Sequence, residues 1–180
     1  MFKRSITLVI AAAPIGAVLA GPATAGVVVY EEGDQKIEIG SRVQIQYIRI
    51  DPDEGDATDQ VLFRRLRPYI SGTVTKNWYG KIQFDFGKTL DGDEVAVKDA
   101  YMRYTGWKNM KLTIGNSKTP FSREFLTSSE CLQTVERGFI GDHNFGTPER
   151  QLGFQLEGHN DSKKVSWALA FGGEQHDPDV

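Results

Sequence analysis

The stretch IEIGSRVQIQY, residues 37–47, decides the fold class of this chain. Its apolar residues occupy every second position or nearly so, and they are Ile37, Ile39, Val43, Ile45 and Tyr47. The positions between them are polar, and they include Glu38, Arg42, Gln44 and Gln46. A repeat of two residues is the period of a β-strand whose two faces meet different environments. The stretch therefore predicts a strand with one apolar and one polar face.

Six further segments repeat this alternation, and we predict a strand in each, over residues 62–74, 81–86, 99–104, 111–117, 151–157 and 165–172. Several of the seven strands are about ten residues long, which is the length that a tilted membrane-spanning strand needs. With a mean hydropathy of −0.37 the chain is too polar for a bundle of membrane helices, but not for a barrel of alternating strands.

The predicted connections alternate between long and short. The long ones are residues 51–59, 88–94 and 119–149, and the short ones lie near residues 76–77, 106–109 and 160–162. An up-and-down membrane barrel has short turns at one end and longer loops at the other. Trp78, Trp107 and Trp167 fall near strand ends, where an interfacial aromatic girdle would lie. The pattern predicts an all-β, antiparallel, transmembrane β-barrel portion of about seven strands.

The predicted polar faces carry more basic than acidic residues. The six basic ones are Arg42, Arg65, Arg67, Lys81, Arg103 and Lys111, and the four acidic ones are Glu38, Asp85, Asp99 and Glu157. In a barrel this face would line the lumen, and basic linings favour anions. Pairing of these charges across strands, with no effect on permeation, is the alternative. Strict alternation points the neighbouring Arg64 to the opposite, outer face.

Residues 119–149 are too many for an ordinary connection in a compact domain. The segment contains seven large apolar residues together with Arg123 and Arg137. If it folds into the lumen, these residues become buried and the pore narrows. A loop that packs on the barrel rim is the alternative, and the sequence leaves both open.

The first 25 residues are typical of a cleaved signal peptide. Lys3 and Arg4 precede an uncharged apolar run, and Ala23-Thr24-Ala25 has the small-x-small form of a cleavage site. Removal of Lys3 and Arg4 leaves 19 basic against 24 acidic residues, so residues 26–180 carry a net charge of −5. This balance argues against a nucleic-acid partner. We expect a protein exported to the outer membrane of a Gram-negative bacterium.

The sequence shows no pattern of a catalytic or cofactor site. Its three histidines lie 16 and 17 positions apart, which is not a metal-ligand spacing, and no phosphate-binding or nucleophile motif occurs. The one cysteine, Cys131, cannot form an internal disulfide. We expect no metal, no cofactor and no enzymatic activity. A small exported β-protein that acts as a ligand-binding or surface module is the alternative to a channel.

Several stretches resemble, in order, the family of phosphate-selective porins of the O and P type. They are FRRLR (63–67), VKDAY (97–101), TIGNSKTPFS (113–122), LTSS (126–129), VER (135–137) and RQLGFQL (150–156). The resemblance implies an outer-membrane barrel of about sixteen strands, usually a homotrimer. It also implies a ladder of arginines that leads anions such as phosphate to a constriction.

By motif position, Arg64 and Arg65 look like members of that ladder, and Asp99, Arg137 and Lys118 look like constriction residues. We therefore expect small anions, outer-membrane lipid and lipopolysaccharide as partners. Seven strands cannot close so wide a barrel, so we expect this chain to be the N-terminal part of a longer porin, because open sheet edges are prohibitive in lipid.

Overall fold

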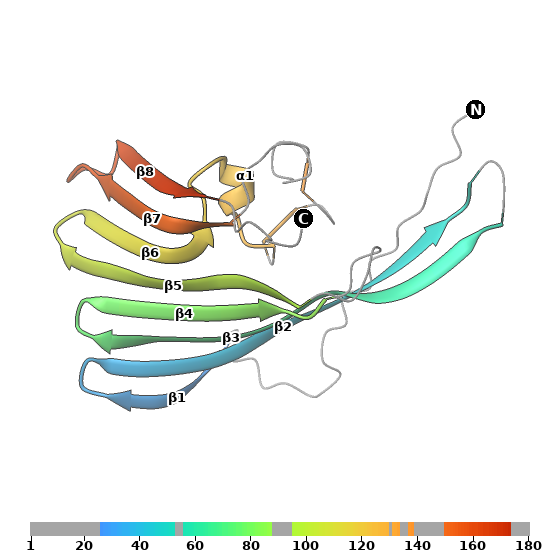
Figure 1. Ribbon diagram of the computed structural model, residues 1–180, viewed down its shortest axis with the longest axis horizontal. Helices are drawn as coiled ribbons and strands as arrows, with labels where there is room; N and C mark the ends of the chain where they lie inside the picture. The colour runs from blue at the N-terminus through green and yellow to red at the C-terminus, as the bar shows by residue number, and fades with distance from the viewer. Residues whose placement is uncertain are drawn as a thin grey trace.

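A computed structural model describes residues 26–52, 56–87, 95–129, 131–133, 137–138 and 150–173. Eight antiparallel strands form one sheet in which each strand pairs with its neighbour in sequence (Figure 1). The strands are β1 (Gly26–Glu32), β2 (Gln35–Ile50), β3 (Thr58–Thr75), β4 (Trp78–Asp85), β5 (Ala96–Trp107), β6 (Met110–Lys118), β7 (Arg150–His159) and β8 (Ser166–Gly173). One short helix, α1 (Arg123–Leu126), follows β6. The predicted all-β, up-and-down architecture is confirmed.

The first strand, β1, is absent from the seven predicted strands, so the prediction of seven was one short. It pairs with β2 through the two-residue turn Gly33-Asp34, where Gly33 has a φ of +57°. The register shifts between Val28 and Tyr30, so β1 has no regular alternation. Its apolar residues run consecutively, which hides the period of two. No described helix has both the length and the apolar character needed to cross a membrane.

The short turns lie together at one end of the sheet, on the left in Figure 1, and the long connections leave the other end. Aromatic side chains cluster at the short-turn end. The ring of Tyr104 lies 5.1 Å from that of Trp78 and 5.1 Å from that of Trp107. Trp167 belongs to the same end, because it pairs with Gly158 next to the β7–β8 turn. This placement agrees with the predicted girdle.

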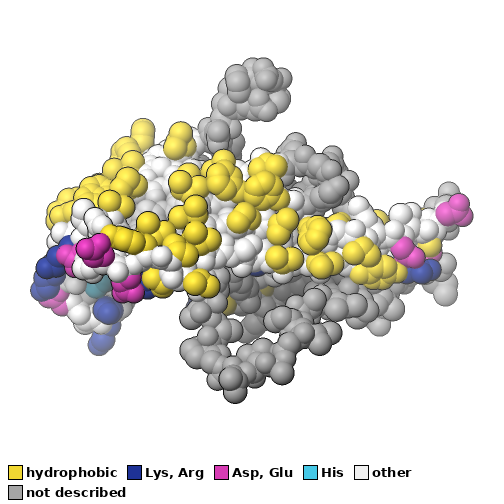
Figure 2. Space-filling model, turned by 90° about the horizontal axis from the view of Figure 1, so that it is seen from below, with side chains coloured by type: hydrophobic (Ala, Val, Ile, Leu, Met, Phe, Trp, Pro, Cys, Tyr) yellow, Lys and Arg dark blue, Asp and Glu magenta, His cyan; other side chains and the backbone are white. Residues whose placement is uncertain are grey.

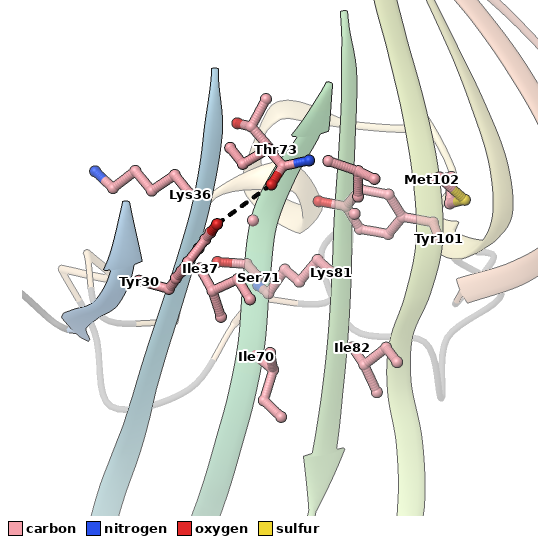
Figure 3. A pocket seen from close by; sticks show the side chains of 14 residues that line it. Tyr30, Lys36, Ile37, Ile70, Ser71, Thr73, Lys81, Ile82, Tyr101 and Met102 are labelled. Carbon is pink, nitrogen blue, oxygen red and sulfur yellow. Dashed lines mark hydrogen bonds between the residues drawn. The ribbon is translucent and has the colours of Figure 1, made fainter. Parts of the chain in front are cut away.

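The two faces of the sheet are inverted relative to those of a water-soluble protein. Polar side chains are buried on one face, with Thr113 1% and Gln83 3% exposed. Large apolar side chains are exposed on the other, with Leu169 66% and Phe171 73% exposed. Figure 2 shows hydrophobic side chains along the length of the visible face and charged ones toward its ends. We call the two faces the polar face and the apolar face.

A β-bulge at Arg64 changes which residues of β3 share a face. Arg65 pairs with Gln44, but the next pair is Phe63 with Ile45, so Arg64 is an extra residue. Strict alternation predicts Leu62 on the apolar face and Phe63 on the polar face, and both assignments are wrong. Leu62 is buried and pairs with Gln46 on the polar face, whereas Phe63 is exposed on the apolar face. A bulge shifts the alternation by one residue.

Candidate functional site

Two arginines on the polar face, Arg42 on β2 and Arg67 on β3, lie directly opposite each other in neighbouring strands. Like charges in this position repel each other unless other groups compensate them. The Nε and Nη2 atoms of Arg67 each lie 2.6 Å from Oδ2 of Asp85 on β4. The other carboxylate oxygen of Asp85 accepts the backbone N–H of Gly87 at 3.1 Å. Asp85 thus fixes the Arg67 guanidinium in one place.

A second carboxylate, Asp99 on β5, binds two cations at once. Its Oδ2 lies 3.0 Å from Nζ of Lys81 on β4, and its Oδ1 accepts a 2.7 Å hydrogen bond from Nε of Arg150 on β7. The side chains of Asp99 and Arg150 are both 11% exposed. Two positive charges and one negative charge leave this trio with a net charge of +1. Three strands therefore converge on one positively charged, largely dehydrated site.

The segment after α1 reaches across the polar face to β2. Ser129 is buried, and its hydroxyl accepts a hydrogen bond from Nη1 of Arg42. Its carbonyl oxygen accepts a bond from the Gln44 amide at 3.4 Å, and Gln44 in turn accepts one from Arg65 at 3.0 Å. Strands β3, β4 and β5 lie between β2 and β6 in the sheet, so this segment spans them.

Two further predicted site residues hold the same segment at its base. The Lys118 ammonium donates to the carbonyl oxygens of Phe125, Leu126 and Thr127, at 2.7, 3.2 and 3.2 Å. Arg137 also donates to the Thr127 carbonyl, at 2.7 Å from its Nη2. These carbonyls end the single turn of α1, where cations are favourable partners. Lys118 and Arg137 thus stabilise the fold of the segment.

Three predicted residues remain, Arg64, Arg103 and Arg123. Arg103 donates to the Thr113 hydroxyl at 3.0 Å, and its guanidinium lies 5.0 Å from the ring centre of Tyr101. Arg64 is the half-buried bulge residue of β3. Arg123 is exposed at the first position of α1 and belongs to none of these clusters.

Four residues complete the site although the sequence did not single them out as site residues: Gln44, Asp85, Ser129 and Arg150. Asp85 was predicted on the polar face, and its alternation with Phe84 and Phe86 was the available signal. Arg150 was noted only as the first residue of the stretch RQLGFQL (150–156). Its contact with Asp99 joins residues 51 positions apart, which no local pattern reveals.

Among the described residues, no group of three or more His, Cys, Asp or Glu side chains could hold a metal ion. The cations of the site are the guanidinium groups of Arg42, Arg65, Arg67 and Arg150 and the ammonium group of Lys81. Guanidinium and ammonium groups donate hydrogen bonds but accept none. Such an arrangement can attract and partly desolvate an anion, with no covalent step.

Comparison with known proteins agrees with the resemblance noted in the sequence. Residues 37–179 match the family described as phosphate-selective porin O and P. The chain is also similar to porin O of Pseudomonas aeruginosa, with 32% identity over 104 residues. That alignment covers 56% of this chain and 24% of the relative, so the chain matches about a quarter of the relative's length.

Proposed function

Because the chain belongs to the phosphate-selective porin O and P family, we propose that it forms part of the wall of an outer-membrane channel. In this proposal small solutes cross by passive diffusion, with a bias toward anions such as phosphate. The eight strands are one part of a larger closed barrel. The polar face lines its lumen and the apolar face meets lipid.

The inverted distribution of polar and apolar side chains carries this proposal. An exported protein that stays in water gains nothing from exposing a whole sheet face of Val, Ile, Leu and Phe, because large apolar patches promote association. A barrel in lipid requires this arrangement, with apolar residues outside and polar residues inside. The aromatic residues at the short-turn end, Trp78, Tyr104 and Trp107, would lie at the membrane interface.

The anion bias follows from how the charges on the polar face are compensated. Asp99 compensates only one of its two cations, Lys81 and Arg150. Arg103 contacts a hydroxyl and an aromatic ring. The Lys118 ammonium donates to backbone carbonyls and lies over the Phe125 ring, and these contacts contribute no negative charge. Fixed cations in a narrow aqueous passage favour anions, and guanidinium suits phosphate because it donates two parallel hydrogen bonds.

We further propose that residues 119–149 narrow the lumen. The contacts of Ser129 with Arg42 and Gln44 support this, because they hold the segment over the polar face. Lys118 and Arg137 would then act by positioning the segment as well as by their charge. Residues 130, 134–136 and 139–149 of the predicted loop lie outside the described residues.

The proposal includes the partners and location that the family implies. The apolar face would contact outer-membrane lipid and lipopolysaccharide, and three copies would assemble into a homotrimer. Residues 1–25, the predicted signal peptide, lie outside the described residues. Export with cleavage after Ala25 would leave Gly26, the first residue of β1, at the start of the mature chain.

Reversal potentials in a planar bilayer test the channel. The protein purified from outer membranes should conduct, and a KCl gradient should give a reversal potential of the sign expected for anions. Arg65→Gln, which removes a cation 5% exposed on the polar face, should shift this potential toward the cation side. Arg49→Gln is the matched control, because Arg49 forms an exposed ion pair with Asp59 at 3.6 Å. Absence of conductance, or cation preference in the wild type, would refute the proposal.

A further inference from the structure

A second bulge lies in β5, and it concerns a basic residue outside the predicted site. Asp99 pairs with Gln83, but the next pair is Val97 with Phe84, so Lys98 is an extra residue. This repeats the geometry at Arg64, where the pairs on either side are Arg65 with Gln44 and Phe63 with Ile45. Each bulge therefore inserts one basic residue between an apolar-face residue and a polar-face residue.

The exposure of the neighbours shows what the bulge does to the faces of β5. Val97 is 45% exposed opposite Phe84 on the apolar face, whereas Asp99 is 8% exposed on the polar face. In a regular strand, two residues that are two positions apart share a face. Val97 and Asp99 lie on opposite faces, so the alternation of side chains shifts by one residue at Lys98. Bulges often re-aim side chains in this way beside functional sites.

A specific side chain stabilises the bulge at Lys98. The Asn116 amide on β6 donates to the carbonyl oxygens of both Val97 and Lys98, each at 3.2 Å. The β5–β6 pairing ends with Ala100 and Asn116, so these two carbonyls lie beyond the last pair of that ladder. Asn116 thus replaces the missing strand contacts and holds the bulge in place.

We infer that the bulge in β5, held by Asn116, turns Lys98 onto the polar face, where it is a further residue that determines anion preference. Asp99 pairs with Gln83, which is buried on that face, and in a bulge the extra residue, here Lys98, opposes the same partner residue. Lys98 is itself half-buried. The opposite orientation would place an ammonium group in lipid, which costs about 2–4 kcal/mol at mid-membrane and less near the interface. Asn116 is a positioning residue in this arrangement. The inference rests on the proposed channel function.

Thiol labelling tests the orientation without any assumption about selectivity. In a Cys131→Ser background, Lys98→Cys and Val97→Cys are introduced singly into the membrane-embedded protein. The inference predicts that a negatively charged, water-soluble thiol reagent modifies the cysteine at 98 and leaves that at 97 unmodified. A regular strand continued from Asp99 predicts the reverse, and that result would overturn the inference.

Reversal potentials test the role in selectivity. Lys98→Gln should lower the anion-to-cation permeability ratio about twofold, because it removes one screened charge near the permeation path. Lys108→Gln is the matched control, since Lys108 is 81% exposed in a turn and pairs with Asp161. Asn116→Ala should lower the ratio in the same direction, and should add nothing in a Lys98→Gln background.

The outcomes separate this inference from the channel proposal. If Arg65→Gln lowers the ratio but Lys98→Gln does not, the inference is wrong and the channel proposal stands. If neither variant changes the ratio, the proposed anion selectivity of the polar face is wrong. If Asn116→Ala leaves the ratio unchanged, Asn116 does not position Lys98, and the role of Lys98 is decided by its own variant.

Discussion

Replacement of Asp99 by Asn is the most informative single change in the proposed channel. The Asp99 carboxylate lies 3.0 Å from Nζ of Lys81 and 2.7 Å from Nε of Arg150. Asparagine has nearly the same shape and can still accept a hydrogen bond from either cation. The substitution therefore changes the net charge of the trio from +1 to +2 with little loss of packing. We expect the preference for anions to increase.

The size of the increase can be worked from Coulomb's law. For an anion about 6 Å from the carboxylate, one unit charge in water contributes about 0.7 kcal/mol, or about threefold in relative permeability. At ~0.1 M salt the Debye length of about 10 Å reduces this effect to about twofold. At ~1 M salt the Debye length is about 3 Å and the effect should nearly vanish.

The assay is the reversal potential under a KCl gradient at the two salt concentrations. Asp59→Asn is the control, because Asp59 is a 52% exposed carboxylate that pairs with Arg49 near the loop end of the β2–β3 hairpin. Asp99→Asn should raise the anion-to-cation ratio at low salt, and Asp59→Asn should change it far less. A lower ratio, or an equal change in both variants, would refute the assignment of Asp99 to the lumen.

Three other changes test the fold, the loop and the orientation in the membrane. Ser129→Ala removes the hydroxyl that accepts a hydrogen bond from Arg42. Because a hydrogen bond to a charged group contributes about 1.5–3 kcal/mol, tryptic cleavage in the segment after β6 should accelerate about tenfold. An unchanged cleavage rate would show that this bond does not hold the segment. Ile82→Arg replaces a residue of the apolar face that is 49% exposed. If this face meets lipid, the substitution should destabilise the barrel by about 2–4 kcal/mol, as measured by urea unfolding from vesicles. Unchanged stability would indicate that residue 82 is exposed to water. Gly115→Ala should destabilise the sheet by about 1–3 kcal/mol in the same assay. Gly115 has a φ of +118°, and an added Cβ would lie 2.3 Å from the Ala100 carbonyl oxygen. Unaltered stability would contradict that geometry.

The sequence predicted the strands whose two faces differ most in polarity. Alternation between residues 37 and 47 located β2, although the strand extends to Gln35 and Ile50. It failed for β1, where Val27, Val28 and Val29 are consecutive and the register shifts after Val28. A period of two can be recognised only where neighbouring residues differ in polarity, so a uniformly apolar strand gives no signal.

The bulges and the loop contacts lay beyond local sequence patterns. The bulge at Arg64 reverses the faces of Leu62 and Phe63, and no residue type in that stretch marks its position. The contact between Ser129 and Arg42 joins residues 87 positions apart. Such contacts depend on how the strands are ordered in the sheet. Alternation predicted that Arg65 and Asp99 lie on the polar face. It could not show which cations the Asp99 carboxylate binds.

In the proposed channel one face of this sheet meets lipid and the other meets water, and labelling along β2 tests this arrangement. Single cysteines at Ile39 and Val43 on one face, and at Glu38 and Gln44 on the other, are introduced into a Cys131→Ser background. In the membrane-embedded protein a water-soluble thiol reagent should modify the cysteines at 38 and 44 only. Equal modification at all four positions would contradict the account, because both faces would then be exposed to water.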